Sequence, residues 1–252
     1  MVISPAKTLE FQGEPWEDFS IPEQLDRSQV LVDSLRALSA EDLGHLMKIS
    51  PRLAQLNFQR FQAFRTPFTP QNARQALFAF RGDVYKGIDI DTYEREDLQF
   101  AQRSLRILSG LYGVLRPLDL IQPYRLEMGT KLQTAQGNTL YGFWGRHISE
   151  QLKGALSDHD YPCLINLASS EYFKAVDPAA LHYPVISMVF REKKAEKYKV
   201  VAIHAKRARG LMVDYAIRQR IEQPEKLQQF AVEGYRFSPQ LSSDYEWVFC
   251  RG

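Results

Sequence analysis

Two glycines three residues apart, Gly110 and Gly113, have a spacing that suggests anion binding. They lie in LSGLYGVLRPLDLIQPYR, residues 108–125. Glycine accepts positive φ and close approach of another backbone, so this spacing predicts a tight turn with exposed N–H groups. Pro117 suits the first turn of a following helix, and the residue before Pro123 is expected to end it. The segment therefore predicts a helix, a glycine hairpin and a second helix that together can hold a phosphate.

This pattern is similar to the helix-hairpin-helix motif of DNA-binding proteins, in which hairpin amides hold a backbone phosphate. The similarity predicts that the backbones of Gly110, Leu111 and Gly113 contact DNA, assisted by Arg116 and Arg125. The match is incomplete because the second helix is short and no small residue follows the second glycine. The alternative is an ordinary αα-hairpin whose glycines only permit close packing.

Polar and ionisable residues form a second candidate group, because they follow predicted strand ends and turns. They are Lys7, Arg125, Glu127, Asn166, Ser169, Glu171, Tyr172 and Arg209. Such residues could line a pocket for a nucleotide or damaged base, with Glu127 or Glu171 as acid or base and Lys7 or Arg209 holding phosphate. The alternatives are a solvated loop for Lys7 and helix capping for Ser169.

Basic residues are concentrated in residues 193–220. Nine Lys or Arg against two carboxylates give this segment a formal charge of +7, which leaves −5 for the rest of a chain whose net charge is +2. This asymmetry predicts an anionic partner. Lys206, Arg207 and Arg209 open a predicted helix and oppose its dipole, so DNA phosphates or carboxylates elsewhere in the chain must compensate them.

The elements that must position these residues follow from hydrophobic spacing, caps and turn residues. Helices are predicted from Pro22, over 40–49 and 51–64, from Asp91 to the glycine hairpin, within 138–156 and from Lys206. Strands are predicted at 1–4, 77–80, 124–129, 163–167, 183–191, 198–205, 232–237 and 246–250. No internal repeat or linker appears, so we expect one compact mixed α/β (α+β) domain over residues 1–252.

Composition is that of an ordinary globular protein, with 44% hydrophobic and 25% charged residues. Neither a long apolar run nor a leader is visible, which predicts a cytoplasmic protein without a membrane partner. Cys163 and Cys250 are far apart and form no C-x-x-C motif, so neither a disulfide framework nor a thiol-redox site is expected. The five histidines show no metal-binding spacing, and we expect no metal or cofactor. Nothing in the sequence indicates a protein partner.

Five stretches, in chain order, together resemble the YaaA family of peroxide-stress proteins. They are ISPAKT, LFAFRGDVY, LSGLYGVLRPLDLIQPYRLEMG, INLASSEYF and AKRARGLM. The resemblance implies a cytoplasmic bacterial protein that limits oxidative damage during hydrogen peroxide stress and is associated with lower unincorporated iron. It also implies a family-specific mixed α/β fold with a basic cleft and a helix-hairpin-helix element, and binding of double-stranded, distorted DNA.

Three functions remain open at this point. The first is DNA binding without enzymatic activity and with little sequence preference, because no recognition helix rich in Asn, Gln or Arg is apparent. The second is an enzyme of the glycosylase or lyase type that acts through the polar pocket. The third, iron sequestration, would require a carboxylate and histidine cluster that the sequence does not display.

Overall fold

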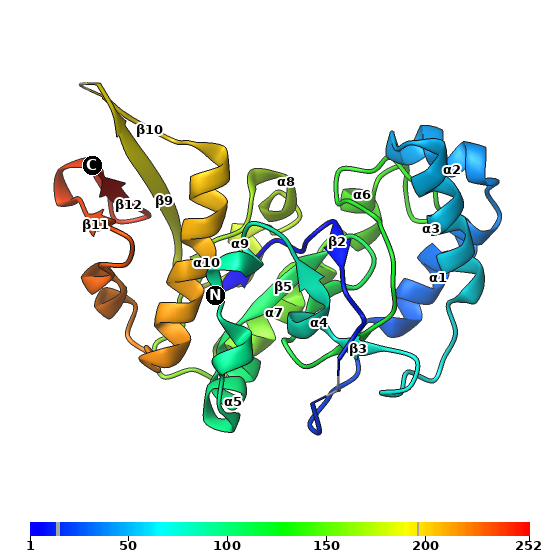
Figure 1. Ribbon diagram of the computed structural model, residues 1–252, viewed down its shortest axis with the longest axis horizontal. Coiled ribbons are helices and arrows are strands. Elements are labelled where there is room, and N and C mark those ends of the chain that lie inside the picture. Colours follow the sequence, from blue (N-terminus) through cyan, green and yellow to red (C-terminus); the bar gives the residue numbers. More distant parts are fainter. Residues whose placement is uncertain (14–15, 196) are drawn as a thin grey trace.

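A mixed eight-stranded sheet runs through the computed structural model, which describes residues 1–13, 16–195 and 197–252 (Figure 1). Its order is β11-β12-β9-β8-β1-β5-β6, with β10 paired to β9. The strands are β1 (Val2–Ile3), β5 (Arg106–Ser109), β6 (Gly113–Leu115), β8 (Leu164–Asn166), β9 (Val185–Lys194), β10 (Lys197–Lys199), β11 (Arg236–Phe237) and β12 (Glu246–Arg251). The five strands from β12 to β5 are parallel, and the outer pairings are antiparallel. The predicted mixed α/β class is confirmed.

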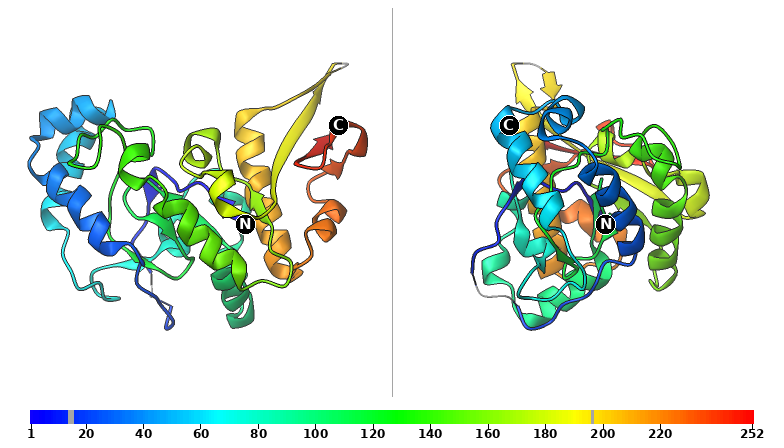
Figure 2. Two further views of the ribbon diagram at one scale, coloured as in Figure 1. Left: turned by 180° about the vertical axis from the view of Figure 1, so that it is seen from behind. Right: turned by 90° about the vertical axis from the view of Figure 1, so that its right-hand side faces the viewer.

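Helices cover both faces of this sheet. α7 (His147–Ser157) and α9 (Pro178–Leu181) pack together on one face, whereas α5 (Arg95–Ser104) and α10 (Ala202–Arg218) lie on the other (Figure 1 and Figure 2). A parallel sheet covered on both faces needs apolar residues throughout its strands. The central strands meet this need, since Val2, Ile3, Leu164 and Ile165 are all buried.

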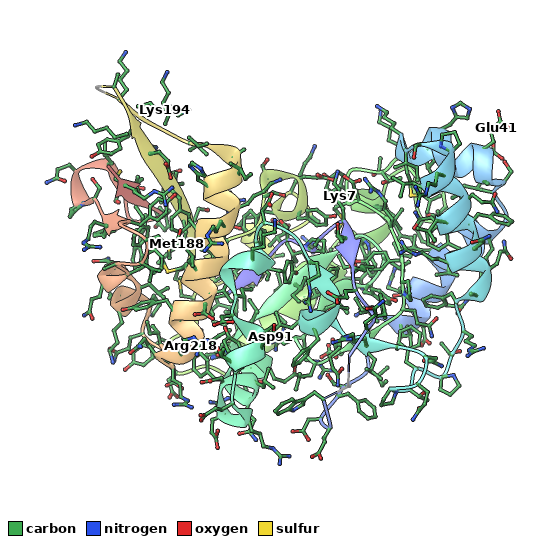
Figure 3. All side chains as sticks on the ribbon, in the orientation of Figure 1. Lys7, Glu41, Asp91, Met188, Lys194 and Arg218 are labelled. Atoms are coloured by element: carbon green, nitrogen blue, oxygen red, sulfur yellow. The ribbon has the colours of Figure 1, made fainter. Side chains whose placement is uncertain are left out.

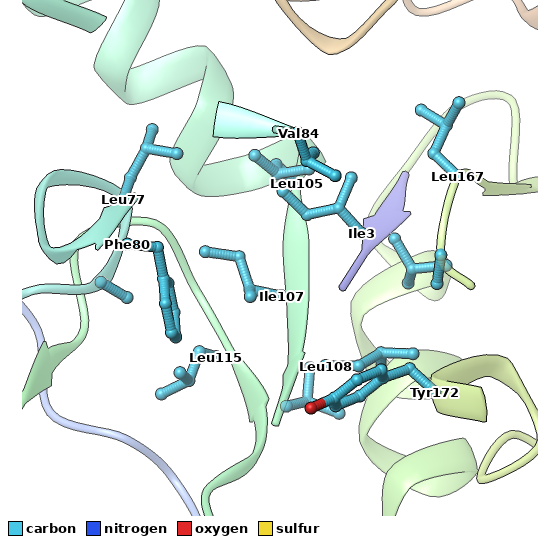
Figure 4. Packing of buried hydrophobic residues seen from close by; sticks show 14 of the residues in the cluster. Ile3, Leu77, Phe80, Val84, Leu105, Ile107, Leu108, Leu115, Leu167 and Tyr172 are labelled. Atoms are coloured by element: carbon cyan, nitrogen blue, oxygen red, sulfur yellow. The ribbon is translucent and has the colours of Figure 1, made fainter. Parts of the chain in front are cut away.

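The hydrophobic core is continuous across β1, β5 and β6 and the helices around them. Figure 4 shows Ile3, Ile107 and Leu108 packed between Leu115 on one side and Tyr172 on the other. Ile3, Ile107, Leu108 and Leu115 have no exposed surface. Burial of this kind supplies most of the favourable free energy of folding.

The molecule is elongated, with three helices at one end. They are α1 (Leu25–Arg36), α2 (Ala40–Met47) and α3 (Pro51–Ala63). One margin is concave, because the β9–β10 hairpin rises at one end and α2 and α3 rise at the other (Figure 1).

Short elements lie between the two ends: β2 (Thr8–Leu9) with β4 (Phe80–Arg81), β3 (Arg74–Gln75) with β7 (Leu120–Ile121), α4 (Ala76–Ala79), α6 (Leu140–Trp144) and α8 (Ser170–Phe173). The described residues also form four 3₁₀ turns: Tyr85–Gly87, Ile90–Thr92, Pro224–Gln229 and Pro239–Leu241. Among the described residues, the helices are all too short or too polar to cross a bilayer.

The predicted helix-hairpin-helix at 108–125 is wrong. β5 and β6 form a tight β-hairpin there, with Ser109 paired to Gly113. The side chain of Ser109 accepts the N–H groups of Leu111 and Tyr112 at 3.2 and 3.1 Å, so these amides are not free for phosphate. Gly113 has φ of +70°, and an added Cβ would lie 2.8 Å from the Trp144 ring. The glycines therefore serve close packing, as in the alternative reading, but they belong to a β-hairpin that packs against the backbone at 126–127 and the ring of Trp144.

Other errors concern short strands. Residues 124–129 form no strand, and the strand expected at 198–205 is shortened to Lys197–Lys199 because α10 already begins at Ala202. The strand at 77–80 is α4 followed by β4, and that at 232–237 is reduced to Arg236–Phe237. In contrast, the helices predicted over 40–49 and 51–64 are present as α2 and α3, each begun by a serine cap at Ser39 or Ser50.

Candidate functional site

A cleft lies at the carboxyl edge of the central strands, where the chain leaves β1 and β8. After β1, the next strand of this sheet along the chain is β5, which lies beside β1 on one side of the cleft. After β8, the next strand is β9, which lies beside β8 on the other side. Such a switch point is where open α/β sheets bind ligands. Ser4 follows β1 and Ser169 follows β8, and the Ser169 N–H donates to Ser4 Oγ at 2.9 Å. The two hydroxyls are also bonded to each other, at 3.2 Å.

The cleft has a volume of about 680 Å³ and collects most of the predicted pocket residues. It is lined by Ser4, Pro5, Ala6, Lys7, Thr8, Arg81, Gly82, Asp83, Val84, Tyr85, Lys86, Glu127, Ser169, Glu171, Tyr172, Lys206 and Arg209. Lys7 lies near the middle of the concave margin (Figure 3). Segments more than 200 residues apart in the chain thus contribute charged side chains to one concave space.

Lys7, Glu127 and Arg125 form a continuous ion-paired group at this cleft. Lys7 Nζ lies 2.6 Å from Glu127 Oε2, and Arg125 Nη2 lies 2.9 Å from Glu127 Oε1. The lysine side chain is 62% exposed, whereas that of Glu127 is 25% exposed. One carboxylate held by two cations is fixed in orientation, as an acid–base group or a hydrogen-bond acceptor must be.

Glu171 supplies a second carboxylate from α8. Its Oε1 accepts the backbone N–H of Gly129 at 3.0 Å, which fixes the side chain against the loop that carries Glu127. Tyr172 beside it is buried, and burial raises the pKa of its phenol well above the usual value. The phenol therefore stays protonated at neutral pH and can only donate a hydrogen bond or accept one as a neutral group.

α10 supplies the cationic wall through Lys206 and Arg209, three residues apart on one helical face. The wall is fixed by glycine: a Cβ on Gly210 would overlap the Val84 carbonyl oxygen, and one on Gly87 would overlap the Arg207 carbonyl oxygen. The turn at 84–87 therefore lies directly against the α10 backbone, as only glycine permits.

Seven predicted site residues lie outside the cleft, four through their side chains and three in the glycine turn. Asn166 donates to Ser187 Oγ at 3.1 Å, and its own oxygen accepts the Ala168 N–H, so it fixes the strand end. Arg207 is ion-paired with Glu233 at 2.6 Å, and Arg116 with the buried Asp119 at 2.9 Å. The fourth, Arg125, does not line the cleft itself but reaches it through Glu127. Gly110, Leu111 and Gly113 are buried in the β-hairpin.

A larger hollow of about 770 Å³ contains none of the predicted residues. Two of its three arginines are ion-paired, since Arg95 lies 3.0 Å from Asp18 and Arg220 lies 3.5 Å from Asp97, and the third, Arg103, lies over the Phe100 ring. We therefore regard the cleft at the sheet edge as the candidate site, since its charges come from several elements and converge there.

The β9–β10 hairpin, called here the lysine arm, extends the basic segment above the sheet. Lys193, Lys194, Lys197 and Lys199 are all exposed. None of the four forms an ion pair within the described part of the chain, whereas Arg207 and Arg218 of α10 are paired with Glu233 and Asp214. The net positive charge of residues 193–220 is therefore concentrated at the arm and at the cleft wall.

Sequence reasoning did not single out the turn between α2 and α3, which has the helix–turn–helix form expected at 108–125. Lys48 takes the left-handed conformation, with φ of 53°, and Ser50 and Pro51 begin α3. Lys48, Ser50 and Arg52 are exposed. The signal was present in the sequence, because the two correctly predicted helices leave only a short turn, three residues long in the structure, that is followed by a proline and a cation.

Neither cysteine has the features of a peroxide-reactive thiol. Burial raises the pKa of Cys163 to about 11, and the pKa of Cys250 is also raised by burial. Peroxide reacts with the thiolate, which both environments disfavour at neutral pH.

Comparison with known proteins places the whole chain in one family. Residues 1–241 match the family model described as "Peroxide stress protein YaaA". A UPF0246 protein of Acaryochloris marina is 59% identical over 251 residues, covering 100% of this chain and 99% of its own. Similar proteins of Magnetococcus marinus and Cellvibrio japonicus are 52% and 50% identical, each covering 99% of this chain and 98% and 97% of their own. The chain belongs to the YaaA family of peroxide-stress proteins.

Proposed function

We propose that this peroxide-stress protein acts in the cytoplasm by binding double-stranded, distorted DNA with little sequence specificity, and so limits iron-dependent oxidative damage. The observation that carries the proposal is the lysine arm, whose four exposed lysines lack carboxylate partners among the described residues. Such cations neutralise phosphates and release counterions, which favours binding to any sequence.

The turn between α2 and α3 supports the same proposal from the other end of the concave margin. Arg52 lies in the first turn of α3, where backbone N–H groups have no partner within the helix. Together with the exposed side chains of Lys48 and Arg52, this helix N-terminus suits a backbone phosphate. Figure 3 shows Lys194 of the arm and Glu41 of α2 at opposite ends of one margin, with Lys7 between them.

The concave outline favours DNA that is already bent. A straight duplex must deform to contact both ends of the margin, whereas a junction or gapped duplex has already lost part of its stiffness. Bound protein would then cover backbone positions that iron-generated oxidants attack.

A salt titration tests the proposal. The logarithm of the binding constant for a gapped duplex should fall linearly with the logarithm of the salt concentration, with a slope of about −0.9 for each neutralised phosphate. Changing Lys194 and Lys197 to Gln should make the slope shallower by about 2, and two random sequences should bind equally.

The matched control removes two exposed lysines that belong neither to the arm nor to the cleft lining, Lys153 on α7 and Lys226. It should leave the slope unchanged. Binding that does not depend on salt, or equal loss in both double variants, would contradict DNA binding through the arm.

A second function is favoured by the convergence of Lys7, Glu127 and Glu171 in one cleft. An enzyme acting on a nucleotide or damaged base would use Glu127 or Glu171 as acid or base. Release of free base or strand cleavage from damaged duplex would support it, and the same cleavage by a Glu127→Gln, Glu171→Gln variant would exclude this assignment.

A further inference from the structure

Arg209 differs from the other arginines near it on α10. Arg207 is paired with Glu233 at 2.6 Å and Arg218 with Asp214 at 2.9 Å. Arg209 lines the cleft, and within residues 1–13, 16–195 and 197–252 its side chain forms no ion pair or hydrogen bond; its Nε is fully buried. The side chain as a whole is part-buried, and removal from water lowers the pKa of its guanidinium.

Burying a charged group without a partner is costly unless a ligand supplies the opposite charge. A guanidinium presents paired N–H donors that match the oxygens of a phosphate. We infer that the cleft binds a phosphate-bearing ligand of nucleotide size, with Arg209 as its phosphate ligand and Lys206 as a second cation on the same face.

The other charges of the cleft show where the phosphate belongs. Lys7 is paired with Glu127 at 2.6 Å, Arg81 with Glu10 at 2.8 Å and Lys86 with Asp83 at 3.8 Å. Among the described cations that line the cleft, this leaves Lys206 and Arg209 without a carboxylate. The anionic end of a ligand is therefore drawn to α10.

The remaining polar groups suit a ligand end that donates hydrogen bonds. Glu127 and Glu171 are acceptors, and the hydroxyls of Ser4 and Ser169 form part of the lining. A sugar hydroxyl or an exocyclic amino group of a base can donate to these carboxylates. A continuous duplex would instead place further phosphates against them, so a single phosphate-bearing nucleotide fits this charge pattern better.

The cleft is large enough and is already formed. Its volume of about 680 Å³ lies within the usual range of small-molecule sites. The close contact of Gly210 with Val84 holds the wall at 81–86 against the helix that carries Arg209, so little ordering is needed when the ligand enters. The inference uses the cleft proposed above as an enzyme site, but it requires binding only and no reaction.

Binding of adenosine 5′-monophosphate, guanosine 5′-monophosphate and unphosphorylated adenosine to the full chain tests the inference by titration calorimetry. Both monophosphates should bind, and adenosine should not reach the same affinity. Inorganic phosphate should compete, whereas chloride at equal ionic strength should not. Arg209→Met should weaken monophosphate binding by about tenfold or more, the usual cost of losing a charge-assisted contact.

Arg207→Met is the matched control, because Arg207 lies on the same helix but is paired outside the cleft. It should bind within about twofold of the unchanged protein, given the small contribution of exposed pairs. If Arg209→Met fails to fold, Lys206→Gln serves as the test variant, because Lys206 is exposed. It should weaken monophosphate binding by a smaller factor.

Two experiments distinguish a free nucleotide from a nucleic acid end as the source of the phosphate. One uses free monophosphates, and the other compares a short single strand bearing a 5′-phosphate with the same strand bearing a 5′-hydroxyl. Preference for either phosphorylated form supports the inference and identifies the source of the phosphate. Failure of both forms to bind, equal binding of adenosine, or unchanged binding by Arg209→Met would overturn it. Turnover is not measured, so failure of catalysis and failure of binding stay distinct.

Discussion

Two hairpins of this molecule contrast in how they use their turn. The β5–β6 hairpin carries Gly110 and Gly113, the residues with the spacing expected of a phosphate-binding turn, yet it is buried beneath Trp144. The turn between α2 and α3 has no glycine, yet it exposes Lys48 and the N-terminal turn of α3. The contrast teaches that turn residues define a backbone path, whereas access to a ligand depends on what packs over that path.

The two turns also differ in how many of their backbone N–H groups are already hydrogen-bonded. In the β-hairpin, Ser109 accepts two N–H groups and also bonds to the hydroxyl of Tyr124 at 2.7 Å. At the start of α3, the Ser50 hydroxyl accepts one described backbone donor, the Leu53 N–H, at 3.4 Å. A buried hydroxyl with three partners serves stability, whereas an exposed cap leaves neighbouring donors for a ligand.

The largest effect is expected from Gly110→Ala. The added Cβ would overlap the Leu126 carbonyl oxygen, so the hairpin must shift at a cost of about 3 kcal/mol or more. Gly44→Ala in α2 is the matched change, because its Cβ would lie 3.4 Å from Ala54 Cβ and helix propensity favours alanine. Denaturant unfolding should show a large loss for the first and a change within about 1 kcal/mol for the second. Similar losses in both would break the contrast.

A smaller effect is expected from Ser109→Ala. It leaves two buried N–H groups without their acceptor, so the free energy of unfolding should fall by about 2 kcal/mol. Ser50→Ala removes one exposed cap and should cost about 1 kcal/mol or less. Thermal and denaturant unfolding measure both changes. A greater loss of stability from Ser50→Ala would show that the exposed turn depends on its serine more than the buried hairpin does.

The smallest effect concerns binding. Changing Lys48 and Arg52 to Glu should weaken binding to gapped DNA roughly tenfold, or about 1.4 kcal/mol, with stability retained because both residues are exposed. Reversing Lys153 and Lys226 in the same way serves as the control and should change affinity less. If the two double variants lose equal affinity, the α2–α3 turn has no specific part in DNA binding.

Sequence reasoning worked best where local signals agreed with packing. Serine caps and hydrophobic spacing located α2 and α3, and the apolar run at 163–167 located β8. It failed at 108–125 because Trp144 and Leu126, which bury the glycines, come from later segments that no local pattern connects to the turn.

Much of the candidate site also followed from position after strand ends. Lys7, Ser169, Glu171 and Arg209 were expected near one another, and they line one cleft. The sequence could not show that Arg207 is ion-paired whereas Arg209 lines the cleft. The partner of Arg207, Glu233, lies in a loop more than 20 residues away. Charge counting identified the basic segment but not which of its cations are neutralised.

The lysine arm also has a consequence for how copies of this protein meet. Within the described part of the chain, β10 pairs with β9 alone, which leaves an open strand edge on a projecting hairpin. Such edges invite pairing with another chain, and natural proteins discourage it with lysines. The same cations that suit a nucleic acid backbone therefore repel a second arm, so neutralising them should make the protein less soluble at high concentration.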